Sequence, residues 1–396
     1  MMKLAFFTEA YDPFINGVVT SLKTLRGSLE ELGHKVTIFA PRYAGYEDGD
    51  PNVVRLPSVR WLAYHYRLLS PLARNHDVLA GGGFDLIHSH HPFTMSRLAE
   101  RLAAKHGLPL VYSFHTMLHE YGQYVPVLAD AGSHWLTARY RRHCHRADRV
   151  VVATEVVRDV LRAQGVTATI TVVPEGVPPQ VPTPGGRGRV RQKLALSAGT
   201  PLVLYAGRLA REKQLGFLLR AFSRLARTHD ARLCLVGGGP LAQGLRAEAQ
   251  RLGISDRVII CGWVPHERIA DYYAAADIFV FPSTADAMGI ALVEAMSVGL
   301  PCVAISRYGP SEVVVNEVTG LLTAFDETDF SDAIRRLLDD PRLRERMGEG
   351  ARRRARDFDP ALTTARLVEV YQSAMTDHTR CRAAAARRTE KGVLIP

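Results

Sequence analysis

The 396-residue sequence has few cysteines, no long apolar run and no surplus of acidic side chains. Its five cysteines are scattered and lack CxxC spacing, so neither a disulfide framework nor a zinc site is expected. No run approaches the roughly 20 apolar residues that a membrane-spanning helix needs. The acidic Glu9 comes too early for a signal peptide. These absences together predict a soluble protein of the reducing cytoplasm.

Basic charge is in excess, and it is unevenly placed. Lys and Arg number 50 against 40 Asp and Glu, which gives a formal net charge of +10. Residues 176–200 hold four basic side chains and no acid, and residues 379–396 hold five basic side chains and one acid. No recognisable nucleic-acid-binding motif accompanies them, so a nucleic-acid partner is not expected. The surplus favours contact with an anionic surface such as a membrane.

Short apolar segments alternate with amphipathic helical ones, which is typical of βαβ units and parallel sheets. In the first half the predicted strands are Lys3–Thr8, Lys35–Ala40, Asp85–His88, Leu110–Phe114, Arg149–Ala153 and Thr169–Val173. The second half repeats the pattern with predicted strands at Leu202–Ala206, Arg232–Val236, Val258–Cys261, Ile278–Phe281 and Cys302–Ile305. Two doubly wound α/β domains are therefore expected, with ligands at the carboxyl ends of the strands.

Proline and glycine interrupt this pattern once, around Pro178–Gly186, and predict a linker there. The expected organisation is an acceptor-binding domain at 1–177, a linker at 178–200, a donor-binding domain at 201–358, a helix at 359–378 returning to the first domain, and a basic tail without assigned structure at 379–396.

Two loops of the second half could bind phosphate. Gly207-Arg208 and Lys213 follow a strand, and a glycine beside two cations suits a diphosphate, although a solvated turn explains them equally well. Gly237-Gly238-Gly239 also follows a strand but lacks GxGxxG spacing, so a plain tight turn is the preferred interpretation.

A third candidate joins a polar loop to a helix. Asp286 lies in the loop, the helix begins near Gly289, and Glu294 lies more than one turn inside it. Free backbone N–H groups at 289–291 predict an anion site. The alternative is an N-capping Asp286 and a solvated or salt-bridged Glu294.

Together these motifs resemble the retaining family 4 glycosyltransferases. Their acid-x7-acid motif has its counterpart in Asp286 and Glu294, with Asp in place of the usual first Glu and Met288 in place of the usual aromatic residue. Further matching segments, spread over residues 3–375, are Asn16–Val19, Val172–Val177, Gly262–Pro265, Ala295–Pro301 and Gly320–Leu322. The resemblance implies the GT-B fold, in which two Rossmann-like doubly wound parallel-sheet domains face each other across a cleft.

It also implies a nucleotide-sugar donor, held mainly by the second domain. Arg208 and Lys213 would neutralise the diphosphate, Glu294 would bind the ribose, and Asp286 would hold the transferred sugar. Other implied donor contacts are Gly17, Gly207, Gly238, Trp263, Val264, Met288, Gly289, Ile290 and Ala291. The leaving phosphate would take the acceptor proton, with retention, and neither metal nor cofactor is expected.

One histidine, His115, matches the position where the family places a histidine near the donor sugar, and is predicted to be catalytic together with Arg208, Lys213 and Asp286. For His88, His90 and His91 a structural role is preferred.

The first half resembles one branch of the family, the bacterial diacylglycerol glucosyltransferases, which are similar to phosphatidylinositol mannosyltransferases. The segments that carry this likeness are Thr8–Ser21 and Phe114–Met117. They imply transfer from UDP-glucose or a similar donor to diacylglycerol, in glycolipid biosynthesis at the inner membrane face. Val59–Leu69 and Arg139–Arg146 could dock to an anionic bilayer. An acceptor-pocket loop and a solvated helix end remain the respective alternatives.

Three other activities stay open. The acceptor could be a soluble sugar, a cyclitol or a small metabolite, or GDP-mannose could serve a phosphatidylinositol-type lipid. The departures at Asp286 and Met288 also allow a nucleotide-sugar-binding protein without catalysis.

Overall fold

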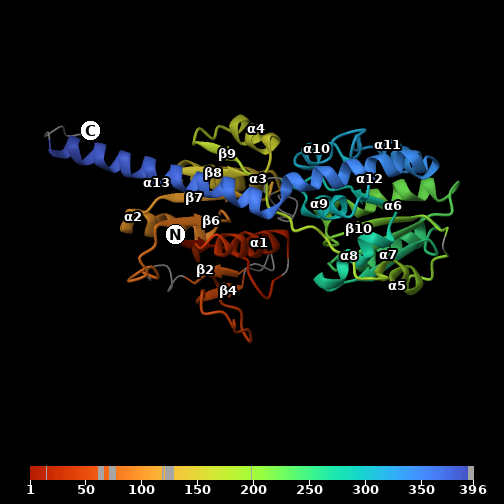
Figure 1. The fold of residues 1–396 in the computed structure, drawn as a ribbon, viewed down its shortest axis with the longest axis horizontal. Coiled ribbons are helices and arrows are strands. Elements are labelled where there is room, and N and C mark those ends of the chain that lie inside the picture. Colours follow the sequence, from red (N-terminus) through yellow and green to blue (C-terminus); the bar gives the residue numbers. More distant parts are fainter. Residues whose placement is uncertain are drawn as a thin grey trace. The chain divides into compact units, whose positions relative to one another are not determined.

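The computed structural model describes residues 1–14, 16–60, 67–70, 77–117, 120, 129–197 and 199–390. The chain divides into two compact units, one made of Met1–Gly176 with Pro360–Pro396 and the other of Val177–Asp359. Each unit contains one large parallel sheet with helices packed on it (Figure 1). The prediction of two parallel-sheet α/β domains is therefore confirmed.

The first unit has a seven-stranded parallel sheet in the order β3-β2-β1-β6-β7-β8-β9. Its strands are β1 (Lys3–Phe7), β2 (Lys35–Pro41), β3 (Val53–Leu56), β6 (Leu86–Ser89), β7 (Leu110–Phe114), β8 (Arg149–Val152) and β9 (Ile170–Val172), and a separate antiparallel pair is formed by β4 (Ser58–Arg60) and β5 (Arg67–Leu69). Its helices are α1 (Gly17–Glu31), α2 (Thr94–His106), α3 (Ala129–Arg146), α4 (Glu155–Ala163) and α13 (Pro360–Glu390). Every residue of β7 is buried, as expected for a parallel strand covered on both faces.

Helix α13 brings the C-terminal segment back to the first unit. Leu367, Val370 and Tyr371 pack in the same core as Leu4 and Phe6 of β1. The helix continues to Glu390, beyond its predicted end at residue 378, because alanine and arginine are strong helix formers. The last turns of α13 extend beyond the edge of the first unit's sheet (Figure 1).

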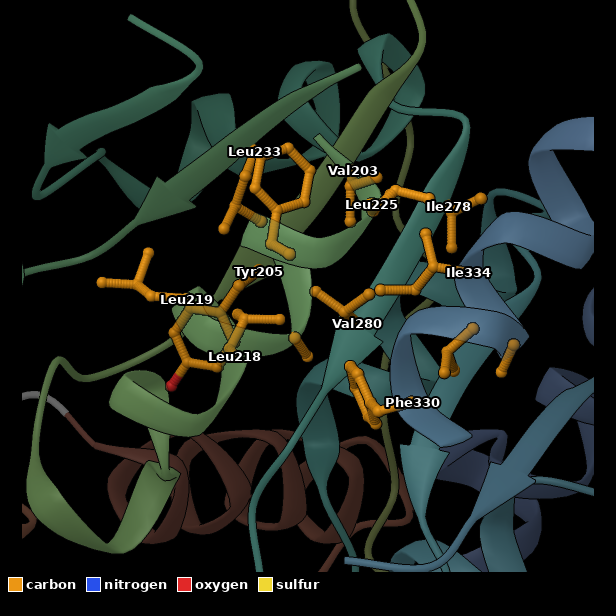
Figure 2. Close-up of a cluster of buried hydrophobic side chains, with 14 of the residues drawn as sticks. Val203, Tyr205, Leu218, Leu219, Leu225, Leu233, Ile278, Val280, Phe330 and Ile334 are labelled. Atoms are coloured by element: carbon orange, nitrogen blue, oxygen red, sulfur yellow. The ribbon is translucent and has the colours of Figure 1, made fainter. Parts of the chain in front are cut away.

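The second unit has a six-stranded parallel sheet in the order β12-β11-β10-β13-β14-β15. Its strands are β10 (Leu202–Ala206), β11 (Arg232–Val236), β12 (Val258–Gly262), β13 (Ile278–Phe281), β14 (Cys302–Ile305) and β15 (Gly320–Thr323). Its helices are α5 (Gly186–Lys193), η3 (Arg211–Lys213), α6 (Leu215–Leu225), α7 (Ala242–Arg251), α8 (His266–Ala275), α9 (Ile290–Ser297), α10 (Pro310–Val313), α11 (Glu327–Asp339), α12 (Pro341–Ala355) and η4 (Arg356–Phe358). Figure 2 shows the core on one face of this sheet, where Leu218 and Leu219 of α6 and Phe330 of α11 meet Val203 and Val280.

The predicted linker at 178–200 is wrong in part, because it contains helix α5, which packs on α8. Val190 is buried, and Arg191 donates hydrogen bonds to the carbonyl oxygens of Ala275 and Thr200. Arg187 likewise donates to the carbonyl oxygen of Ala274. The chain is irregular before and after this helix. Arg191 is buried within the unit, whereas the Arg187 side chain is 51% exposed.

Strand order reverses at one point in each sheet, between β1 and β6 and between β10 and β13. At such a point in a doubly wound sheet the loops after the two central strands run in opposite directions, and ligands bind in the crevice outside the carboxyl ends. Ligand-binding residues are therefore expected on the loops that follow these four strands. Over the ranges the structure describes, no helix combines the length and apolar character needed to cross a bilayer.

Candidate functional site

Lys213 and Asp286 form an ion pair at the point of strand-order reversal in the second unit. The Lys213 Nζ lies 2.7 Å from each carboxylate oxygen of Asp286. Lys213 ends η3, which follows β10, and Asp286 lies in the loop after β13. Helix α9 is instead preceded by Gly289 and has no side-chain cap, so the N-capping alternative for Asp286 is wrong.

The surrounding loops hold this pair in place. The Ser283 hydroxyl donates to the carbonyl oxygen of Glu212, 3.2 Å away, and so ties the β13 loop to η3. The Lys213 ammonium also lies 5.7 Å from the centre of the Phe281 ring. Arg208, five residues before Lys213, has an exposed side chain, and its carbonyl oxygen accepts a hydrogen bond from the hydroxyl of the buried Tyr205. Of the two predicted phosphate-binding cations after β10, Lys213 is paired and Arg208 is open to solvent.

Glycines let the backbones of three neighbouring loops approach closely. The Gly237 N–H donates to the carbonyl oxygen of Gly262, 2.8 Å away, and a Cβ on Gly237 would lie 1.9 Å from the carbonyl oxygen of Gly207. Gly238 is exposed, and a Cβ there would meet nothing within 4 Å. Gly237 is therefore required by packing, whereas Gly238 leaves backbone open to a ligand.

The start of α9 presents backbone N–H donors one turn before Glu294. Gly289 has a φ of 92°, and Leu292 is the first residue whose N–H donates to the carbonyl oxygen of Gly289. The N–H groups of Ile290 and Ala291 thus have no intrahelical acceptor, as at any helix start. Met288 is buried just before them.

Glu294 is half-buried one turn further along α9. It accepts a hydrogen bond of 2.7 Å from the hydroxyl of Tyr273, a fully buried residue of α8. Burial raises the pKa of Glu294 above its ordinary value, and the Tyr273 hydrogen bond opposes that rise. Tyr273 therefore holds one carboxylate oxygen of Glu294, and the other oxygen has no protein donor in the part of the chain described. The two residues predicted to contact the base, Trp263 and Val264, follow β12, and they are exposed and half-buried respectively.

In the first unit, His115 follows β7 and belongs to a row of hydrogen-bonded side chains. Its Nδ1 lies 2.7 Å from Glu175 Oε1, and its Nε2 lies 3.1 Å from Nδ1 of His90. Burial lowers the pKa of His90 well below its usual range, so this ring is neutral. His88 is held by the hydroxyls of Tyr371 and Ser113 and is structural, as predicted.

A buried acid, Glu9, lies at the strand-order reversal of the first unit. Its Oε1 accepts hydrogen bonds from the Met95 N–H at 2.5 Å and from the Thr94 hydroxyl at 3.3 Å, at the start of α2. Burial raises its pKa to about 8. Gly17 is the exposed first residue of α1, whose Val19 N–H donates to Asn16 Oδ1. Among the residues described, no three His, Cys, Asp or Glu side chains gather as metal ligands would.

Comparison with known proteins identifies the family. The model described as Glycosyltransferase Family 4 matches residues 15–181, and that described as Glycosyl transferases group 1 matches residues 187–354. A D-inositol 3-phosphate glycosyltransferase of Nocardia farcinica is 33% identical over 320 residues, which are 76% of this chain and 69% of that protein. The chain belongs to the family 4 glycosyltransferases.

Two further similarities agree with this family. An alpha-monoglucosyldiacylglycerol synthase of Streptococcus pneumoniae is 28% identical over 345 residues, covering 84% of this chain and 77% of that protein. The crystal structure of Anabaena HepE in complex with UDP-glucose has a TM-score of 0.76 at 20% identity, covering 94% of this chain and all of that one. The prediction of a GT-B glycosyltransferase is confirmed.

In this glycosyltransferase the sequence-predicted donor residues of the second half gather on loops at the carboxyl ends of β10 to β13. Tyr273, which contacts Glu294, was not predicted as a site residue. The two residues that contact His115, Glu175 and His90, were not predicted either, and nor was Glu9. Glu175 lies in a matching segment and could have been found there. Tyr273 carries no local signal, because only the packing of α8 on α9 brings it to Glu294.

The structure describes the two predicted membrane-docking segments to different extents. In Arg139–Arg146, Arg139 donates to the carbonyl oxygen of Pro92 and His143 is buried against Glu100, while Arg141 and Arg142 are exposed. Only part of this cationic segment therefore faces solvent. In Val59–Leu69, residues 61–66 lie outside the described residues.

Proposed function

We propose that this enzyme transfers a hexose, with retention, from a UDP-sugar such as UDP-glucose to diacylglycerol. The observation that carries the donor half is the Lys213–Asp286 pair at the strand-order reversal, with Arg208 and the α9 N–H groups on adjoining loops. A diphosphate would be neutralised by the two cations, which is the largest electrostatic contribution to breaking a sugar–phosphate bond.

Each remaining group has a proposed task in the same step. The Lys213 ammonium moves from Asp286 to the diphosphate when the donor binds, and the released Asp286 carboxylate accepts hydrogen bonds from the sugar hydroxyls. Glu294 accepts from the ribose hydroxyls while Tyr273 holds its other oxygen. For His115, which Glu175 orients, the proposed task is to contact the transferred sugar, as the family resemblance implies. The leaving phosphate takes the acceptor proton, and the proposed reaction uses no metal or cofactor.

The lipid acceptor is supported by the pneumococcal relative, whose name refers to monoglucosyldiacylglycerol and which matches 84% of this chain. An exposed face of α3 would suit the inner surface of a membrane. Trp135 is 51% exposed, and Arg141 and Arg142 are exposed on the same helix. Cations near an anionic leaflet contribute about 1 kcal/mol each, so a few give reversible peripheral binding.

A soluble cyclitol phosphate is the second candidate acceptor. The inositol phosphate glycosyltransferase of Nocardia farcinica has the higher identity, 33% against 28% for the pneumococcal relative. This candidate uses the same donor site but needs no membrane surface.

The deciding experiment measures labelled sugar transfer from UDP-glucose, other UDP-sugars and GDP-mannose. Each donor is offered with anionic vesicles containing diacylglycerol, with vesicles containing phosphatidylinositol, or with inositol 3-phosphate in solution. We expect label in the lipid extract of the diacylglycerol vesicles. Label confined to a water-soluble product would favour the cyclitol acceptor. If no arm shows either sugar transfer or donor hydrolysis, the result would support a nucleotide-sugar-binding protein without catalysis.

A further inference from the structure

Two cysteine thiols touch on the sheet of the second unit. The Sγ atoms of Cys234 on β11 and Cys261 on β12 lie 3.3 Å apart. They are 27 residues apart in the sequence, where no spacing motif marks them as a pair. Cys234 is fully buried, and Cys261 is half-buried.

Cys261 lies in a β-bulge of β12. Leu235 pairs with Ile260, but the next residue, Val236, pairs with Gly262, so Cys261 is the extra residue. A bulge re-aims the side chain it carries and recurs beside active sites. Here the residue in the bulge carries its thiol against Cys234 of the neighbouring strand, directly before Gly262.

The two sulfurs differ chemically. The hydrogen bond from the Cys234 thiol lowers the pKa of Cys261, and the nearby Lys193 ammonium acts in the same direction. The same contact, together with burial, raises the pKa of Cys234. Cys261 is therefore the better nucleophile and the more accessible thiol, and Cys234 is placed to react with it afterwards. Cys302 is buried with its pKa raised, and no such contact lowers it.

We propose that Cys234 and Cys261 are a redox-modification site that a hydroperoxide closes to a disulfide. The Cys261 thiolate attacks one oxygen of hydrogen peroxide, which gives a sulfenic acid and hydroxide. The Cys234 thiol then loses its proton and attacks that sulfur, and the hydroxyl group leaves as water. Two thiols and one peroxide thus become one disulfide and two waters.

Closure must shift the two side chains or the bulge that carries Cys261, because the sulfurs move from 3.3 Å apart to bonding distance. Gly262 follows Cys261 and accepts the Gly237 hydrogen bond that joins two loops of the donor site. The disulfide therefore weakens nucleotide binding, and a thiol reductant restores it; this consequence rests on the proposed function.

Peptide mapping of the full-length protein tests the chemistry. The protein is treated with hydrogen peroxide, blocked with N-ethylmaleimide and digested without reductant. We expect one linked peptide pair that contains Cys234 and Cys261 and disappears on reduction with dithiothreitol. Cys302→Ser should still form this link, and Cys234→Ser should not. Oxidation confined to the exposed Cys381, or over-oxidised Cys261 without a link in the wild type, would overturn the proposal.

UDP binding to the same samples tests the consequence. The oxidised protein should bind UDP about tenfold more weakly than the reduced protein, and dithiothreitol should reverse the loss. Unchanged affinity in fully linked protein overturns the effect on binding. Failure of the reduced protein to bind UDP would instead contradict the proposed donor, and the peptide map would still decide whether the disulfide forms.

Discussion

Lys213 holds both carboxylate oxygens of Asp286 at 2.7 Å, so the cation proposed for the diphosphate is paired with the acid proposed for the sugar. The pair keeps each charge compensated until the donor arrives. The two residues should then fail differently. Lys213→Met should weaken UDP binding and lower kcat/KM by about 100- to 1,000-fold, since a charge-stabilising group is lost. Asp286→Asn should lower kcat by a similar factor while UDP affinity changes little.

Titration of UDP by calorimetry beside steady-state kinetics separates these two effects. Arg211→Met is the matched control, because Arg211 is an exposed cation of the same short helix and should leave both measurements near the wild-type values. Equal losses of UDP affinity in the Lys213 and Asp286 variants would contradict the division of roles.

Tyr273→Phe tests how Glu294 is positioned. The Tyr273 hydroxyl donates to Glu294 over 2.7 Å, and both residues lie in packed helices. Loss of a hydrogen bond to a charged group costs about 1.5–3 kcal/mol, so UDP affinity should fall about ten- to hundredfold. Tyr272→Phe on the same helix is the control. An unaltered dissociation constant for UDP in Tyr273→Phe would contradict the positioning of Glu294 by Tyr273.

Two adjacent glycines separate packing from ligand approach. Gly237→Ala places a Cβ 1.9 Å from the Gly207 carbonyl oxygen, at a φ of 133°, and should cost about 1–3 kcal/mol of stability. Gly238→Ala meets open space and should melt at the wild-type temperature. If the donor approaches Gly238, the same variant should bind UDP more weakly. Thermal unfolding with and without UDP measures both effects, and a fully neutral Gly238→Ala would exclude that contact.

Much of the fold could be predicted because its strands are buried on both faces and are therefore continuously apolar. Leu110–Phe114 and Leu202–Ala206 were predicted with their observed bounds. The short strand β3 was missed, because Arg55 interrupts its apolar residues. The proposed donor residues could be nominated from the sequence because loops after parallel strands keep their chemistry local. The contacts Tyr273–Glu294 and Cys234–Cys261 form only through the packing of separate elements, so no local sequence pattern predicts them.

His115 should depend on the carboxylate that orients it. Glu175 lies 2.7 Å from its Nδ1, and His90 lies on the other side of the ring. Glu175→Gln keeps the shape but removes the charge, so kcat should fall about tenfold or more with little change in KM. Glu155→Gln, at an exposed glutamate of α4, is the matched control. A change confined to KM would argue that Glu175 acts in binding alone.

Glu9 should make stability fall as the pH rises. Burial raises its pKa from 4.5 to about 8, so between these values the folded protein holds a proton that the unfolded chain has released. Stability then decreases by up to about 1.4 kcal/mol per pH unit across this window and is independent of this group above and below it. His91, whose pKa burial lowers to about 3, stays neutral throughout.

Glu9→Gln removes this titration and keeps an oxygen that can accept the Met95 N–H. The variant should therefore gain stability over the wild type as the pH rises from 5 to 8, and the gap should be constant from pH 9 upward. Urea unfolding at each pH measures the gap, with Glu155→Gln as the exposed control. A gap that does not change between pH 5 and 8 would mean that Glu9 is ionised in the folded protein, stabilised there by Arg139 and the start of α2.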